Sequence, residues 1–299
     1  MLVWRGEPMN NREIQDAWKY HDGTKHSYWS IRNNPHFLDW ANRPLPFKIY
    51  PELEPLPLPR DVPQTGVAAL AAISEPVPSS RADSVPGVQD LGRLLYFSAG
   101  ITKQRAYPGG EIYFRAAACT GALYEIELYV VSSDLPGLDA GVYHFNPADV
   151  SLRLLRKGNF RGNLAQATAM EPAVAHAPAT ILCTGTYWRN AWKYQARTYR
   201  HFGWDSGTLL ANMLAVCTAS GLTGEIVLGF VDVEVNACSI WICGVRFPCA
   251  SYRSGVHRRV RCRYRERLPR LAWRQSRFHT TRSNIPPCLR CTTHLRLNL

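Results

Sequence analysis

The segment that most constrains the fold runs from residue 179 to residue 221, where three sequence patterns follow one another without a break. Residues 179–187 read ATILCTGTY, a small and apolar run that predicts a buried strand. Residues 207–220, GTLLANMLAVCTAS, have Leu and Met at helical spacing. We expect a helix there that Asp205 or Ser206 caps and Gly221 ends. A buried strand that leads directly to an amphipathic helix predicts a packed core containing both.

A basic and aromatic stretch, Tyr187–Trp204, joins this strand to this helix. Seven of its eighteen residues are aromatic, four are Arg or Lys, and none is Asp or Glu. If the stretch coils, Arg189, Lys193 and Arg197 are four residues apart on one face, where like charges oppose a helix by a few tenths of a kcal/mol per pair. Such a face indicates an anionic ligand or a role in chemistry. A solvated basic face over an aromatic core is the alternative that these residues leave open.

Strand and helix patterns alternate through the middle of the chain, which indicates an α+β domain. Five prolines between Pro51 and Pro63 predict an extended strap across a domain surface. We therefore divide the chain into an N-terminal extension (1–65), an α+β domain (66–236) and a tail (237–299). The other predicted elements are helices at Arg12–His21, Val67–Ile73, Val88–Ser98 (ended by Gly100 as a C′ glycine) and Leu164–Met170, strands at Ile126–Val131 and Ile226–Val231, and a hairpin with its turn at Asn146–Asp149.

Charge separates the tail from the rest of the chain. The 299 residues carry a formal net charge of +12, yet residues 237–299 hold fourteen Arg, no Lys and a single acid, Glu266. The first 236 residues have 21 basic and 22 acidic side chains and are nearly neutral. An out-of-frame or disordered tail is one interpretation, and a basic arm that binds nucleic acid is the other. The missing lysine and the irregular cysteine spacing favour the first, so nucleic acid is not the expected partner.

Several functional classes lack their sequence signals. No apolar run reaches the roughly 18–20 residues of a membrane span, and the N-terminus has no secretory pattern, so we expect a cytoplasmic protein without a membrane partner. Cys288, Cys291 and His294 supply only half of a tetrahedral zinc site, so we expect no metal. Two loops, 118–122 and 221–224, carry small residues that would let a planar ligand approach the backbone. Ordinary turns are the alternative for both.

Four ordered motifs within residues 10–236 carry a family resemblance: GALYEIELYVV, DLPGLDAGVYHFNP, WRNAWKYQARTYRH with DSGTLLANMLAV, and GLTGEIVLGF. Together they resemble the SagB-type dehydrogenase branch of the nitroreductase-like FMN oxidoreductases. The resemblance implies an α+β, nitroreductase-like fold, with a central, mostly antiparallel sheet flanked by helices. It also implies bound FMN and a homodimer. Of the basic segment that usually contacts the FMN phosphate, this sequence keeps only Arg81.

The same resemblance implies an activity: oxidation of peptide azolines to azoles beside a cyclodehydratase. A proton leaves the azoline Cα while a hydride passes from Cβ to the flavin. The catalytic Lys-Tyr pair of the family falls on Lys193 and Tyr194, and the positive charges of Arg189 and Arg197 would lower the pKa of Lys193 toward that of a base. The implied cofactor contacts are Arg115, Cys119, Thr120, Gly121, Ala122, Arg189, Arg197, Asn212 and Gly229.

Two further activities remain open for the domain. One is a general nitro or quinone reductase that takes hydride from NAD(P)H and acts on a small molecule. The other is a cofactor-free binding subunit of a biosynthetic complex.

Overall fold

The computed structural model describes residues 14–33, 35–61, 64–75, 84–108 and 110–238. These residues fall into two compact units, and the second begins at His36. The first unit contributes α1 (Ile14–Gly23), which overlaps the helix predicted at Arg12–His21, and α2 (Tyr28–Asn33). In the described part of the chain, no helix combines the length and the apolar character needed to cross a membrane.

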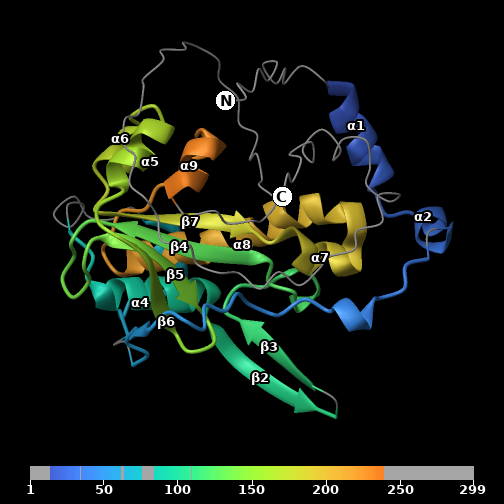
Figure 1. Ribbon diagram of the computed structural model, residues 1–299, viewed down its shortest axis with the longest axis horizontal. Helices are drawn as coiled ribbons and strands as arrows, with labels where there is room; N and C mark the ends of the chain where they lie inside the picture. The colour runs from blue at the N-terminus through green and yellow to red at the C-terminus, as the bar shows by residue number, and fades with distance from the viewer. Residues whose placement is uncertain (1–13, 34, 62–63, 76–83, 109, 239–299) are drawn as a thin grey trace. The chain divides into compact units, whose positions relative to one another are not determined.

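The second unit is built on a five-stranded sheet in the order β1-β6-β5-β4-β7 (Figure 1). Every neighbouring pair in it is antiparallel. The predicted hairpin and the predicted strands at 126–131 and 179–187 are confirmed, as is the α+β class. The strands are β1 (Pro55–Pro57), β4 (Ile126–Ser132), β5 (Gly141–Asn146), β6 (Ser151–Lys157) and β7 (Ala179–Gly185).

Strand β4 lies between β5 and β7 and is buried along its whole length. Successive side chains of a strand point to opposite faces of the sheet. Leu128 and Val130 therefore join the main hydrophobic core on one face. Glu127 and Tyr129 lie on the other face, although both are almost completely buried. The strand thus carries an acidic group and a phenol into the interior.

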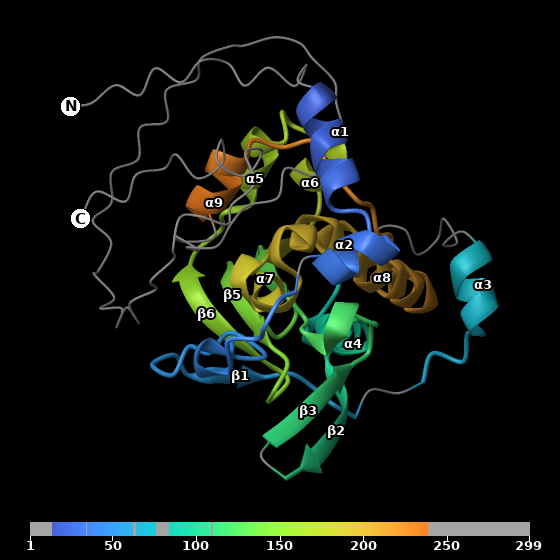
Figure 2. The ribbon, with the colours of Figure 1, turned by 90° about the vertical axis from the view of Figure 1, so that its right-hand side faces the viewer.

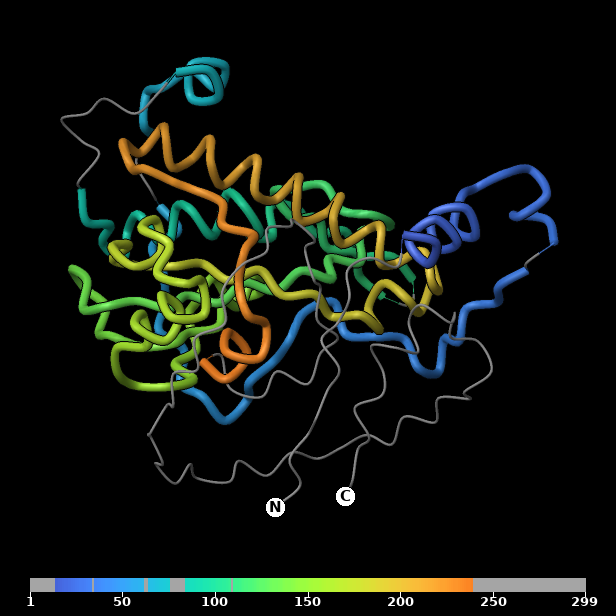
Figure 3. Tube along the Cα trace, turned by 90° about the horizontal axis from the view of Figure 1, so that it is seen from above, coloured from blue at the N-terminus to red at the C-terminus, as the bar shows by residue number. Residues whose placement is uncertain are grey.

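Two helices cover the core face of the sheet: α4 (Val88–Ala99) and α8 (Thr198–Ala219). Leu91, Leu94 and Leu95 of α4 pack there, as the sequence predicts, and Phe202 and Leu209 of α8 join them. Figure 3 shows α8 as one long helix that runs beside α4. A smaller cluster, Val131, Val142, Leu164, Val174 and Cys238, involves three further helices. These are α5 (Arg161–Ala167), α6 (Pro172–Ala175) and α9 (Asp232–Cys238).

The proline-rich strap becomes part of the sheet. Its short strand β1 pairs with β6, with Leu56 opposite Leu152, and the Leu58 N–H then donates to the Val150 carbonyl at 2.9 Å. Prolines are tolerated in β1 because an edge strand has one side without ladder bonds. Residues 36–61 consequently lie in the same compact unit as the rest of the sheet.

The basic, aromatic stretch does not form one continuous helix. Helix α7 (Tyr187–Tyr194) ends where Gln195 adopts φ 51° and ψ −134°, and a short 3-10 turn, η4 (Gln195–Arg197), leads into α8. The predicted basic face is therefore wrong: Arg189 is buried and Lys193 is exposed. Helix α8 also begins earlier than expected, at Thr198. Asp205 lies inside this helix and does not cap it, because its carboxylate binds a different loop.

Two other predictions differ from the structure. Residues 226–231 form no strand, and Ile226, Leu228 and Phe230 remain more than one third exposed because they do not insert into the sheet. Gly100 has φ −67°, so it is not a left-handed C′ residue. Glycine is needed there for space, since a Cβ would stand 2.5 Å from the Tyr96 ring.

The sequence patterns did not predict a second, two-stranded hairpin. It consists of β2 (Ile101–Tyr107) and β3 (Gly110–Arg115), and Figure 2 shows it projecting away from the five-stranded sheet. Its residues are mostly exposed. Its sequence therefore lacks the alternation of apolar and polar residues that predicts a half-buried strand. Helix α3 (Ala69–Ser74) overlaps the helix predicted at Val67–Ile73, and α5 begins three residues before the predicted Leu164.

Candidate functional site

The loop between β3 and β4 folds tightly around the side chain of Cys119. A 3-10 turn, η3 (Thr120–Ala122), occupies the loop, and Gly121, Ala122 and Tyr124 all have positive φ angles. The Tyr124 N–H donates to Cys119 Sγ at 3.0 Å. From the middle of α8, Asp205 accepts hydrogen bonds from the Thr120 N–H at 3.0 Å and from the Thr120 hydroxyl at 2.9 Å. The loop is therefore fastened to α8.

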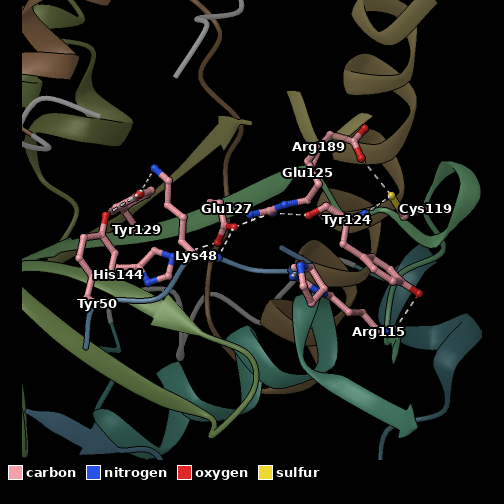
Figure 4. Close-up of polar contacts among 11 residues, drawn as sticks. Lys48, Tyr50, Arg115, Cys119, Tyr124, Glu125, Glu127, Tyr129, His144 and Arg189 are labelled. Atoms are coloured by element: carbon pink, nitrogen blue, oxygen red, sulfur yellow. Dashed lines mark hydrogen bonds and ion pairs between the residues drawn. The ribbon is translucent and has the colours of Figure 1, made fainter. Parts of the chain in front are cut away.

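Three acidic side chains, Cys119, Glu125 and Asp205, meet where the loop is bound to α8. Cys119 Sγ lies 3.2 Å from Glu125 Oε2 and 3.2 Å from Asp205 Oδ2, and Figure 4 shows the first of these contacts. Burial, together with the neighbouring Asp205, raises the pKa of Glu125 to about 8. Burial and the two carboxyl groups raise the pKa of the Cys119 thiol as well. The protein groups alone thus keep the thiol and Glu125 mainly protonated at neutral pH.

The end of α7 lies against the same loop. A Cβ added to Gly121 would stand 2.6 Å from Tyr194 Oη and 3.1 Å from its ring, so the tyrosine covers the glycine directly. Lys193 precedes it, exposed, with Nζ 5.3 Å from the centre of the Tyr194 ring. The predicted catalytic pair and the predicted ring-facing loop are therefore brought together. Their individual roles stay predictions.

A buried ionic network is centred on Glu127 of β4, two residues beyond Glu125. Glu127 pairs with Arg189 Nη1 at 2.6 Å through Oε1 and with His144 Nε2 at 2.9 Å through Oε2 (Figure 4). Burial would raise the pKa of Glu127, but Arg189 and then His144 outweigh it and hold that pKa well below its usual range. Arg189 also donates to the Tyr124 carbonyl at 2.8 Å. The network ties α7 to β4 and to the Cys119 loop.

Arg115 is a further buried charged residue beside this network. Its guanidinium lies 5.0 Å over the Tyr124 ring and donates to the Pro46 carbonyl at 3.0 Å. Burial lowers the pKa of Arg115 to about 10, against the opposing effect of Glu127. Arg115 thus connects the strap to the loop.

The segment that leads into the strap, residues 46–50, adds polar side chains on the Glu127 face of β4. Lys48 donates from its backbone N–H to Glu127 at 3.1 Å and from Nζ to the Tyr129 hydroxyl at 3.0 Å. The Tyr50 and Tyr129 hydroxyls lie 3.3 Å apart, and burial raises the pKa of Tyr129 well above its ordinary value (Figure 4). These contacts hold the strap over the sheet.

The remaining predicted cofactor residues lie elsewhere. Arg197 is placed with its guanidinium 5.5 Å over the Trp204 ring. Asn212 donates to the Phe97 carbonyl of α4 at 3.3 Å. A Cβ on Gly229 would meet nothing within 4 Å. No described contact joins Asn212 or Gly229 to the Cys119 loop, so their cofactor contacts also stay predictions.

The side chains present fit FMN on the ring side only. Ala118 and Gly121 are small and exposed, and Gly121 lies against Tyr194, so a planar group can approach the loop backbone. The phosphate side differs, because the described guanidinium groups of Arg115 and Arg189 are buried and bind protein atoms. A phosphate contact by either would require breaking these bonds. The segment around Arg81 lies outside the described residues.

Sequence reasoning missed Glu125, Glu127, Asp205, Lys48 and His144. A signal for the two glutamates existed, since they interrupt the otherwise apolar run YEIELYVV, residues 124–131, and buried charged residues require partners. Asp205 was interpreted as a helix cap because it precedes the strongest apolar pattern. Lys48 lies in a strap whose sequence has no periodicity, so nothing indicated its contact with β4.

The comparisons with known proteins agree with this fold. No protein-family model matches the chain. A protein of Methanocaldococcus jannaschii that carries the provisional name nitroreductase MJ1384 is 26% identical over 149 residues, which is 50% of this chain and 72% of that protein. The trifolitoxin-processing protein TfxB of Rhizobium leguminosarum bv. trifolii is 29% identical over 134 residues, 43% of this chain and 36% of TfxB.

A crystal structure of a protein from Anabaena variabilis ATCC 29413, also provisionally named a nitroreductase, has the same fold. It matches with a TM-score of 0.61 and 30% identity, covering 75% of this chain and 42% of that one. The chain thus spans less than half the length of the Anabaena protein and of TfxB. The chain therefore has a nitroreductase-like fold, and its sequence is similar to proteins that are provisionally named nitroreductases.

Proposed function

We propose that this chain is an FMN-dependent oxidoreductase that dehydrogenates azolines to azoles in a ribosomal peptide. The observation that carries the proposal is the contact between Tyr194 and Gly121, with Lys193 exposed beside it. A reactive pair and a small-residue loop from separate parts of the sequence meet there at one surface. The similarity to TfxB, whose name describes processing of the peptide trifolitoxin, supports a peptide substrate.

The proposed chemistry requires a proton and a hydride to leave adjacent carbons of the azoline. Bound FMN would supply the hydride acceptor. Lys193 Nζ is the base that takes the Cα proton, since it is exposed and can be approached by a peptide. Tyr194 positions the ring of the substrate and can pass the proton outward, because its hydroxyl stands over the loop rather than in the core. Ala118 and Gly121 leave the backbone open to a planar ligand.

Substituting the lysine tests this assignment. General acid–base groups contribute roughly 10²–10⁴-fold to rate, so Lys193→Ala should reduce azoline oxidation by about that factor while flavin absorbance is kept. Lys103→Ala is the matched control, because Lys103 is an exposed lysine on the β2–β3 hairpin. The rate is measured on a synthetic azoline peptide with full-length, FMN-reconstituted protein. A Lys193→Ala protein as active as Lys103→Ala would disprove the role.

A second candidate activity follows from the provisionally named nitroreductases among the relatives. A general nitro or quinone reductase would oxidise NAD(P)H with a small aromatic acceptor and would ignore the azoline peptide. The same preparation separates the two activities by adding either substrate set. If the chain stays colourless after incubation with FMN, a cofactor-free binding subunit is supported instead. In that case, co-purification with a cyclodehydratase is the appropriate measurement, and gel filtration with light scattering tests the proposed homodimer.

A further inference from the structure

We propose that Cys119, Glu125 and Asp205 form a binding site for one zinc ion. One ligand atom from each residue lies within 4.8 Å of the others, and the thiol sulfur stands 3.2 Å from an oxygen of each carboxyl group. Zinc binds thiolate sulfur at about 2.3 Å and carboxylate oxygen at about 2.0–2.2 Å, so in a tetrahedral site the sulfur stands roughly 3.5–3.7 Å from each oxygen. The two sulfur-to-oxygen distances are within about 0.5 Å of this spacing.

This cluster has fewer hydrogen-bond donors than its carboxylate oxygens can accept from. A thiol carries one proton, yet Sγ lies equally close to two carboxyl groups. In the described part of the chain, no Lys, Arg or His forms an ion pair with Glu125 or Asp205. Of the two nearby arginines, Arg189 is committed to Glu127, and Arg115 donates to the Pro46 carbonyl. Either extra protons or a cation must therefore offset the acidic groups.

Two observations outside the cluster's own hydrogen bonds favour a cation. Glu125 is completely buried, and its Oε1 atom has no hydrogen-bond partner among the described residues. Such an acceptor is costly to leave unsatisfied, and coordination of a metal satisfies it. In addition, a cavity of about 20 Å³ is lined by Cys119 and Asp205, with Arg115 but not Glu125 in its wall. It is large enough for one water molecule, which would supply a fourth ligand.

The ligand set selects the metal. A soft thiolate favours zinc over magnesium or calcium, which prefer sites made only of oxygen. Binding would release the protons of Cys119 and Glu125, because metals bind the deprotonated forms. Groups that orient the ligands are also in place: Thr120 donates twice to Asp205, and the Tyr124 N–H donates to Cys119. Zinc would thus lock the loop beneath Tyr194 onto α8.

Zinc content of the purified, full-length protein tests the site. The chain has other cysteines, including Cys288 and Cys291 in the tail, so the measurement is the difference between variants after equilibrium dialysis against zinc. Wild type should hold one zinc per chain more than Glu125→Gln, and Asp205→Asn should show the same loss. Cys217→Ser and the double change Cys288→Ser with Cys291→Ser are controls that should keep this ion. Thr120→Val, which removes one supporting bond, should weaken zinc binding about 10–100-fold.

Folding of each variant is checked by circular dichroism, and zinc K-edge X-ray absorption of the doubly substituted tail variant gives a second measurement. One sulfur with oxygen neighbours is the expected coordination. Equal zinc content in wild type and Glu125→Gln would overturn the proposal, as would a spectrum without sulfur. In either case, a proton shared by Glu125 and Asp205 would be the explanation for the cluster. These measurements do not depend on azoline oxidation, so the proposed activity and the zinc site can fail separately.

Discussion

Gly121 combines two requirements that no other residue type meets at this position. Its φ of 64° lies in the left-handed region, and its missing Cβ makes room for Tyr194, whose hydroxyl would otherwise stand 2.6 Å away. Only glycine adopts such a conformation without steric cost. The contact between the loop and α7 therefore depends on a single absent side chain.

We predict that Gly121→Ala lowers both stability and activity, because the new methyl group displaces Tyr194. Gly66→Ala is the matched control, since Gly66 has φ 71° but nothing within 4 Å of an added Cβ. Both variants carry the backbone strain, of order 1 kcal/mol, and only Gly121→Ala adds the collision. Thermal unfolding and azoline oxidation are measured for both. Equal losses in the two variants would show that Tyr194 does not rest on the glycine.

Arg189 shows how burial changes the interpretation of a charged residue. In the sequence it belongs to a basic stretch and looks available to an anion. In the fold it is 3% exposed and binds Glu127, which His144 also contacts. Removing one partner of a buried ion pair typically costs about 3–5 kcal/mol, because the other charge stays buried without compensation. A loss of activity on changing Arg189 therefore needs a stability measurement beside it.

At the level of secondary structure, the break between α7 and α8 decides where Lys193 and Tyr194 lie. Gln195 adopts φ 51° and ψ −134°, a combination that side chains with a Cβ disfavour. Its amide also contacts His36 Nδ1 at 2.9 Å. The strained residue turns the chain so that Tyr194 faces the Cys119 loop while Lys193 stays exposed.

We predict that Gln195→Gly is more stable than Gln195→Ala by about 1 kcal/mol. Both changes remove the contact with His36, but only glycine relieves strain of roughly 1–3 kcal/mol, while it adds unfolded-state entropy worth less than that. Urea unfolding of the two variants gives the difference directly. If alanine proves equal or better, the backbone at this position is not strained and another contact must hold the break.

Sequence patterns predicted those helices and strands in which the spacing of apolar residues matches the side that is buried. The leucines of α4 and the apolar run of β4 are examples, and both join the main core. Residues 226–231 have the same apolar composition but remain partly exposed outside the sheet, since composition does not reveal whether a neighbouring strand is present. The break at Gln195 has no sequence signal, because neither glycine nor proline marks it.

The candidate site was predicted only in part for a related reason. Lys193, Tyr194 and the Cys119 loop were identified, but Asp205 lies 86 residues from Cys119 and meets it only because α8 passes the loop. Glu127 and Tyr129 are two residues apart in β4, which puts both on one face, but this spacing does not name Arg189 or His144 as partners. Local patterns predict faces of elements, whereas side-chain clusters depend on how elements pack.

For the whole molecule, the net charge is divided near residue 237. The described core ends with Cys238, which packs with Leu164 and Val174 and whose carbonyl, with that of Ala237, accepts hydrogen bonds from Arg156. Beyond it, the sequence carries fourteen Arg and one acid. The tail therefore carries the positive charge of the chain, whichever of its two interpretations is right.

Truncation tests this division. We predict that a chain ending at Cys238 unfolds at the same temperature as the full chain but is no longer retained on heparin at low salt, because its net charge falls from +12 to −1. A chain ending at Val231 loses α9, including the buried Cys238 and the partly buried Val235, and should be less stable by roughly 2–5 kcal/mol. Thermal unfolding and heparin chromatography separate the two effects. If truncation after Cys238 lowers the unfolding temperature as much as truncation after Val231, the tail belongs to the fold and the out-of-frame interpretation is wrong.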